Sequence, residues 1–151
     1  MNGDGYKLRE NAVIRLHEGM MGEDREELLW SAIAAFEGCE FHTASGLPFT
    51  YNVKRNKIGE PGGELIVSRK EGSKTLTRSS VMFAFSKVYE NGTESGTFTP
   101  PEYGGPKAIG QIFGISYIYS MFHAFGIITV PEKVERKLLQ VTWEDKSTGV
   151  P

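Results

Sequence analysis

Basic and hydroxyl-bearing side chains are concentrated in the stretch SRKEGSKTLTRSSVMFAF, residues 68–85 of the chain. Its cations are Arg69, Lys70, Lys74 and Arg78, and Thr and Ser residues lie among them. Guanidinium, ammonium and hydroxyl groups commonly contact phosphate oxygens, and a helix N-terminus adds unpaired N–H groups and a favourable dipole. Because an apolar helical stripe begins soon after Arg78, the stretch predicts an anion site between a strand end and a helix start. The alternative is a solvated corner between these two elements.

The positive charge of this region is not a property of the whole chain, whose net charge is −2. Residues 1–40 carry four basic and nine acidic side chains, residues 54–90 carry eight and four, and residues 91–151 carry five and six. Such asymmetry indicates what a protein binds rather than how it folds. A binding role requires the basic side chains to share a solvent-facing surface that the acidic first forty residues do not neutralise.

A glycine-rich loop, YGGPKAIG at residues 103–110, carries Lys107 and precedes an apolar segment. If a helix starts there, its terminal N–H groups could hold a phosphate as an auxiliary clamp. The loop lacks the spacing of a P-loop, so nucleotide hydrolysis is not expected. The alternative is a tight turn at the entry to the helix.

The segment AIGQIFGISYIYSMF, residues 108–122, loosely matches a helix-turn-helix pattern. In that interpretation Tyr117, Tyr119 and Ser120 face a major groove. The supposed recognition helix has no Lys or Arg, on which specific DNA readers depend. The sequence therefore favours the alternative, a continuous buried helix over residues 107–125.

Catalytic and metal-binding patterns are weak. The chain has one cysteine, Cys39, and three histidines, His17, His42 and His123. Cys39 and His42 supply only two of the four ligands that zinc requires, and a nucleophile also needs a base and an orienting partner. We therefore expect no enzyme activity, no metal and no cofactor. A pocket that gathers Cys39, His42 and a carboxylate would favour an enzyme instead.

The hydrophobic pattern predicts an α+β fold in which a small antiparallel β-hairpin or three-stranded sheet packs against several α-helices. Alternating apolar residues predict strands, and apolar residues at helical spacing predict helices, the third capped by Thr77. The predicted strands cover residues 40–43, 49–53 and 64–69, and the predicted helices cover residues 6–18, 23–40, 77–91, 107–125 and a short segment after Pro131.

Length and composition predict a single globular domain over residues 1–151, with a mobile tail from about residue 144. The most apolar run, residues 108–130, is diluted by polar residues and glycines, so we expect a packed core helix rather than a membrane span. The N-terminus shows no signal-peptide pattern, and the single cysteine suits a reducing compartment. These features predict a cytoplasmic protein.

We therefore expect a nucleic-acid-binding accessory or regulatory protein that contacts the phosphate backbone. The predicted contacts are Arg55, Arg69, Lys70, Lys74, Arg78 and Lys107. The alternative is a non-catalytic protein-interaction module, such as a small inhibitor or adaptor that docks on a larger partner, with self-association as one version. It would use the same basic surface, or part of an aromatic set. That set comprises Phe113, Tyr117, Tyr119 and Phe122.

Overall fold

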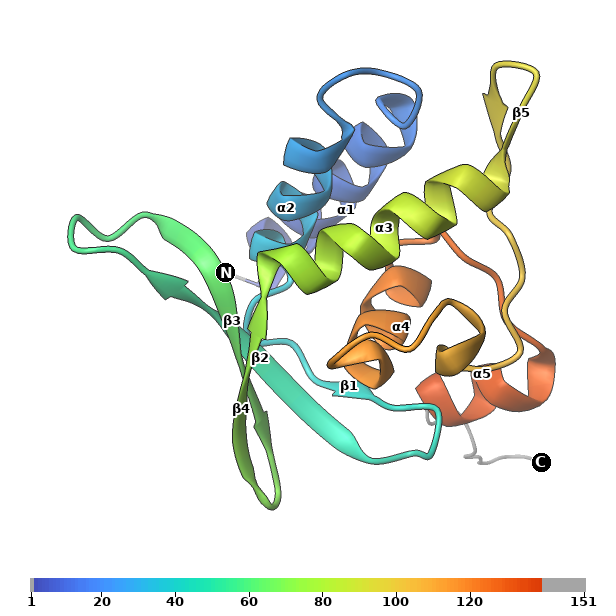
Figure 1. The fold of residues 1–151 in the computed structure, drawn as a ribbon. Helices are drawn as coiled ribbons and strands as arrows, with labels where there is room; N and C mark the ends of the chain where they lie inside the picture. Colours follow the sequence, from blue (N-terminus) through green and yellow to red (C-terminus); the bar gives the residue numbers. More distant parts are fainter. Residues whose placement is uncertain (1, 140–151) are drawn as a thin grey trace.

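The computed structural model describes residues 2–139 and confirms the predicted α+β class. Its main sheet is antiparallel with the strand order β1-β2-β3-β4. The helices gather on one side of this twisted sheet, and the β2–β3 and β3–β4 hairpins project from the helical body in different directions (Figure 1). The tail predicted from about residue 144 lies outside the described residues.

The sheet contains one strand more than the sequence predicted. Strands β1 (Phe41–His42), β2 (Pro48–Arg55) and β3 (Pro61–Arg69) correspond to the three predicted strands. The fourth strand, β4 (Gly72–Thr77), was missed because Leu76 is its only buried residue. One apolar position gives no alternating pattern. The basic stretch is therefore largely a β-hairpin, not a strand end that leads directly into a helix.

The inward face of the sheet follows the predicted alternation. In β2, the side chains of Phe49, Tyr51 and Val53 are buried, and in β3 those of Leu65 and Val67 are buried. Phe41 stacks on Phe49 with 5.4 Å between ring centroids. Tyr51 donates a hydrogen bond from its hydroxyl to the Ile33 carbonyl at 2.6 Å, which ties β2 to a helix.

The first three helices lie where the sequence predicts them, but the first starts four residues before its predicted start and the second ends at Ala35 instead of residue 40. Helices α1 (Asn2–Glu18) and α2 (Arg25–Ala35) pack on each other, and α3 (Arg78–Gly92) begins at the predicted cap. The Thr77 hydroxyl accepts the Ser80 N–H at 3.2 Å. The predicted apolar stripe of α3 is confirmed by the burial of Val81, Ala84, Phe85 and Val88. In α1, Leu16 is buried, whereas Leu8 is exposed.

The segment after α3 differs from the prediction. A small hairpin, β5 (Thr93–Glu94) and β6 (Thr97–Phe98), follows α3, where the sequence predicts no strand. The predicted helix over residues 107–125 is wrong. It is replaced by a single 3₁₀ turn, η1 (Pro106–Ala108), and by helix α4 (Ile115–Ala124). Gly114 has a left-handed φ of 77° at the start of α4, which separates the two elements.

Helix α4 lies at the centre of the core. Its residues Ile118, Tyr119, Met121 and Phe122 are fully buried. From α1, the His17 ring Nε2 donates to the Phe125 carbonyl just after α4 at 2.7 Å. The last helix, α5 (Glu132–Leu139), follows Pro131 as predicted and packs beside β1. No helix in the described part of the chain is long and apolar enough to cross a membrane.

Candidate nucleic-acid interface

The structure places the six predicted site residues on several elements. Arg69 pairs with Phe49 near the start of β2, whereas Arg55 ends that strand. At about 3.3 Å per residue, roughly 20 Å separates the backbones of Arg55 and Arg69. Arg78 begins α3, and Lys107 lies in η1. These cations divide into those that the fold pairs with carboxylates and those that it leaves unpaired.

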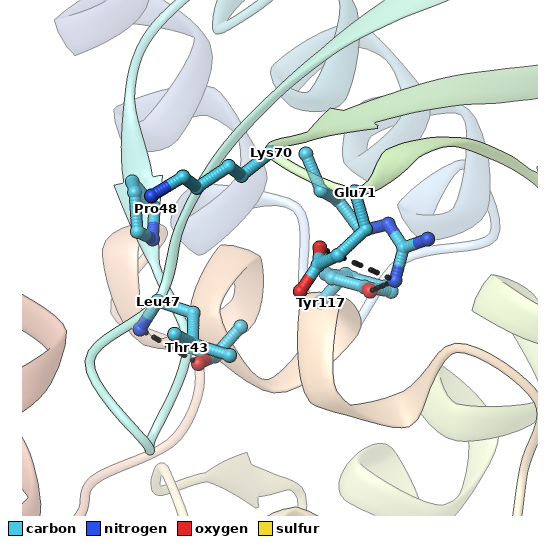
Figure 2. Close-up of a pocket in the computed structure, with 7 residues that line it drawn as sticks. Thr43, Leu47, Pro48, Lys70, Glu71 and Tyr117 are labelled. Atoms are coloured by element: carbon cyan, nitrogen blue, oxygen red, sulfur yellow. Dashed lines mark hydrogen bonds and ion pairs between the residues drawn. The ribbon is translucent and has the colours of Figure 1, made fainter.

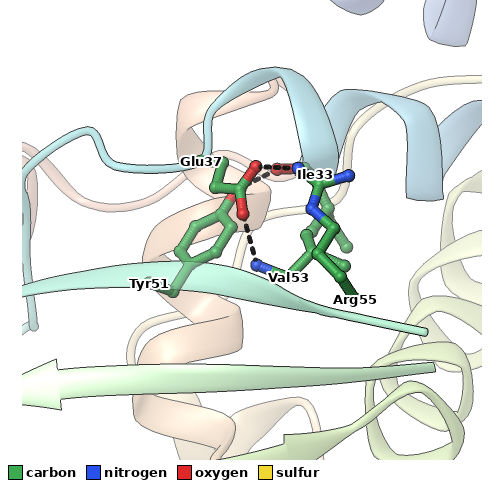
Figure 3. A network of polar contacts seen from close by, with 5 residues as sticks. All are labelled: Ile33, Glu37, Tyr51, Val53 and Arg55. Carbon is green, nitrogen blue, oxygen red and sulfur yellow. Dashed lines mark hydrogen bonds and ion pairs between the residues drawn. The ribbon is translucent and has the colours of Figure 1, made fainter. Parts of the chain in front are cut away.

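Arg55 belongs to the paired group. Its guanidinium donates to Glu37 Oε1 at 2.6 Å, and Glu37 Oε2 accepts the Val53 N–H at 2.8 Å (Figure 3). The Glu37 side chain is only 21% exposed. A binding role required that the acidic first forty residues leave Arg55 unneutralised, and that expectation is wrong.

Arg78 is also paired with an acidic residue of the first forty. Its guanidinium donates to Glu27 Oε2 at 2.9 Å and lies 5.0 Å from the Trp30 ring centroid. The Trp30 indole N–H donates in turn to the Gly62 carbonyl at 3.1 Å. Arg78 thus links the start of α3 to α2, and its charge is compensated within the fold.

Arg69 lies next to the turn at the tip of the β3–β4 hairpin, where its backbone pairs with that of Gly72, and its guanidinium is only partly compensated. It donates to the Gly72 carbonyl at 3.1 Å and to the Tyr117 hydroxyl at 3.2 Å, and Glu71 lies 3.9 Å away. Arg69 and Lys70 line a hollow of about 100 Å³ between this hairpin and β1–β2, and Tyr117 of α4 also lines it (Figure 2). Arg69 therefore positions the hairpin, while Lys70 stays available to a ligand.

Lys74 and Lys87 each lie over an exposed phenylalanine ring. The Lys74 ammonium is 5.5 Å from the Phe113 ring centroid, and the Lys87 ammonium is 5.0 Å from that of Phe83. A Cβ atom built on Gly110 would lie 3.3 Å from Lys87 Cε, so the segment that carries Phe113 runs beside α3. We call Lys74, Phe83, Lys87 and Phe113 the lysine–aromatic strip.

Four lysines of the β3–β4 hairpin, α3 and η1 have no ion-pair partner within residues 2–139. They are Lys70, Lys74, Lys87 and Lys107. Within the described chain, the structure therefore leaves unpaired ammonium groups on the β3–β4 hairpin, α3 and η1, and it also leaves Lys7 in α1, Lys57 in the β2–β3 loop and Lys133 in α5 unpaired.

Two members of the strip, Phe83 and Lys87, were not among the predicted site residues. The sequence contained a signal for Phe83, because it lies outside the apolar stripe of α3 and so puts an aromatic ring on the helix's polar side. Lys87 was counted as part of the basic region but not as a site residue. Its contact with the segment around Gly110 depends on tertiary packing.

The two other predicted phosphate or DNA sites are corrected by the structure. The glycine-rich loop leads into the single turn η1, so no long helix offers its N-terminus to a phosphate near Lys107. In the helix-turn-helix interpretation, Tyr119 and Ser120 would face a groove, yet both are buried. Their hydroxyls donate to the carbonyls of Tyr103 at 2.6 Å and His42 at 2.7 Å. That interpretation is therefore wrong.

A second hollow, of about 180 Å³, lies between β1, α4 and α5, and its lining gathers Cys39, His42 and the carboxylate of Glu40, the combination that would favour an enzyme. The His42 ring is 3.3 Å from Glu40, and His123 Nε2 is 3.1 Å from Glu135. Within residues 2–139, no hydrogen bond joins the thiol to either ring, and no three metal-ligating side chains form a cluster. The enzyme alternative therefore gains the predicted gathering of thiol, imidazole and carboxylate, but the described residues do not form a hydrogen-bonded nucleophile–base pair in this pocket.

Comparisons with models of protein families, with curated proteins and with solved structures find no match to this chain.

Proposed function

We propose that the protein is a nucleic-acid-binding accessory or regulatory protein that contacts phosphate groups through Lys70, Lys74, Lys87 and Lys107. One observation carries the proposal: these four ammonium groups have no carboxylate partner in the described part of the chain, whereas Arg55 and Arg78 do. An ammonium group that is not neutralised by the protein can release condensed counterions when it binds a phosphate. The arginines expected to bind instead stabilise the fold.

The proposed contact is electrostatic and does not depend on base sequence. Four phosphate contacts give a log–log salt slope of about −3, so raising the KCl concentration from about 50 to about 200 mM weakens binding roughly 50-fold. Arg69 contributes mainly by holding the hairpin, because it already donates to Tyr117 and Gly72.

Fluorescence anisotropy with labelled oligonucleotides of several sequences tests this proposal. The double variant Lys70→Ala/Lys74→Ala should weaken binding about equally for all sequences and reduce the magnitude of the salt slope by about 1.5. The matched control, Arg55→Ala/Arg78→Ala, removes the same formal charge but should leave both quantities nearly unchanged. Absence of salt-dependent binding at micromolar protein, or equal losses in the two double variants, would overturn the proposal.

The alternative, a protein-interaction module, now has less support from its aromatic set. Tyr119 and Phe122 are buried and Tyr117 is half-buried, which leaves Phe113 as the exposed member. A partner protein retained on the immobilised chain after nuclease treatment would favour this alternative.

A further inference from the structure

Two exposed aromatic rings lie among the unpaired lysines. The Phe113 side chain is 61% exposed and that of Phe83 is 55% exposed, while all other phenylalanines of the described chain are buried or half-buried. Exposed phenylalanine rings are not needed for the core, and a pair of them beside cations is typical of a surface that binds a ligand with both charged and flat apolar groups.

We infer that the nucleic acid bound by this surface is single-stranded and that Phe83 and Phe113 each stack on an unpaired base. The inference rests on the proposed function and specifies the class of nucleic acid. In a duplex, the flat faces of the bases are covered by their neighbours, whereas in a single strand they are open to aromatic side chains.

The arrangement of the strip supports this assignment. Each ring has an ammonium group over it, 5.0 to 5.5 Å from its centroid, so a base that stacks on that face displaces the lysine, which can then bind the adjoining phosphate. Phe113 is three residues from Gly110, whose backbone lies against Lys87, and three residues span at most about 11 Å. The segment that carries Phe113 therefore passes beside the Phe83–Lys87 pair.

Features that would favour a duplex are weak in the same region. The one segment with a helix-turn-helix pattern buries Tyr119 and Ser120, so it cannot present them to a major groove. Helix α4 also has no Lys or Arg, so it lacks the donors that most often read guanine or contact the backbone. Stacking on the strip is expected to tolerate any base, because every base has a π face.

Anisotropy titrations with a mixed-sequence single strand of about 20 nucleotides, as DNA and as RNA, and with the corresponding duplex test the inference. Wild-type protein should bind the single strands at least about tenfold more tightly than the duplex. Phe113→Ala and Phe83→Ala should each weaken single-strand binding about five- to hundredfold. Both variants should leave duplex binding unchanged, and Phe113→Trp should restore affinity.

Ile58→Ala is the matched control, because Ile58 is 77% exposed but lies in the β2–β3 loop, away from the strip. It should have no effect on binding, and circular dichroism of every variant checks that the fold is retained. Duplex binding as tight as single-strand binding, with both Phe→Ala variants unaffected, would overturn the inference and leave the proposed function standing. If neither the single strands nor the duplex bind, both the inference and the proposed function are wrong.

Discussion

The Glu37 carboxylate connects the chain just after α2 to strand β2 through two different donors, the Arg55 guanidinium at 2.6 Å and the Val53 backbone N–H at 2.8 Å. Val53 is buried, so its N–H has no access to water if Glu37 is lost. The Arg55 side chain is 45% exposed. The carboxylate is therefore more important to stability than the cation that it pairs with.

We expect Glu37→Ala to lower the free energy of unfolding by about 1–3 kcal/mol, because a buried N–H loses its acceptor. Arg55→Ala should cost at most about 1 kcal/mol, since a pair with one partner this exposed is screened by solvent. Urea unfolding monitored by circular dichroism measures both. Glu37→Gln, whose amide oxygen can still accept the Val53 N–H, should recover part of the loss. A larger cost for Arg55→Ala than for Glu37→Ala would contradict this account.

These ion pairs also show where sequence interpretation fails. Arg55 and Arg78 were grouped with the other cations because they are close to them in sequence. Their partners, Glu37 and Glu27, are 18 and 51 residues away. No local pattern encodes a contact across such separations. Only the tertiary structure therefore separates the arginines that form ion pairs from the lysines that do not.

Features that depend on neighbouring residues were predicted well. The alternation through Phe49, Tyr51 and Val53 identified β2 and its buried face, and Thr77 was recognised as the cap of α3. The prediction of one helix over residues 107–125 was wrong, because a run of apolar residues was taken to indicate a continuous helix. Gly114, with its left-handed backbone, ends the preceding turn and lets α4 start only at Ile115.

Gly114 is predicted to be intolerant of any side chain. Its φ is 77°, and an added Cβ would lie 2.4 Å from Cδ1 of the buried Leu76. Gly114→Ala should therefore introduce left-handed backbone strain of about 1–2 kcal/mol. It should also displace a core side chain, which typically costs about 1–3 kcal/mol more. Urea unfolding gives the total.

Gly96 provides the matched control for the backbone contribution. Its φ is 79°, close to that of Gly114, but an added Cβ would meet nothing within 4 Å. Gly96→Ala should show only the strain of about 1–2 kcal/mol. Equal destabilisation by the two substitutions would mean that the contact with Leu76 contributes nothing.

Tyr51 makes the stability of the fold sensitive to alkaline pH. Burial raises the pKa of the Tyr51 hydroxyl well above its ordinary value, and the nearby Cys39 and Glu37 raise it further. An unfolded tyrosine has a pKa of about 10, so above this pH the unfolded chain loses its proton first and unfolding becomes more favourable. Below about pH 10 the phenol is protonated in both states, and its contribution is fully present.

Tyr51→Phe removes this titration together with the hydrogen bond to the Ile33 carbonyl. At pH 7 the variant should be less stable by about 1–2 kcal/mol. Between about pH 10 and 11, wild-type protein should lose up to about 1.4 kcal/mol more than the variant, so the two stabilities converge. Burial, with the Glu102 charge, raises the pKa of Tyr119 to about 12, but this group is common to both proteins. The difference between the two pH profiles, measured by urea unfolding, therefore isolates Tyr51, and parallel profiles would show that its hydroxyl is not held neutral by the fold.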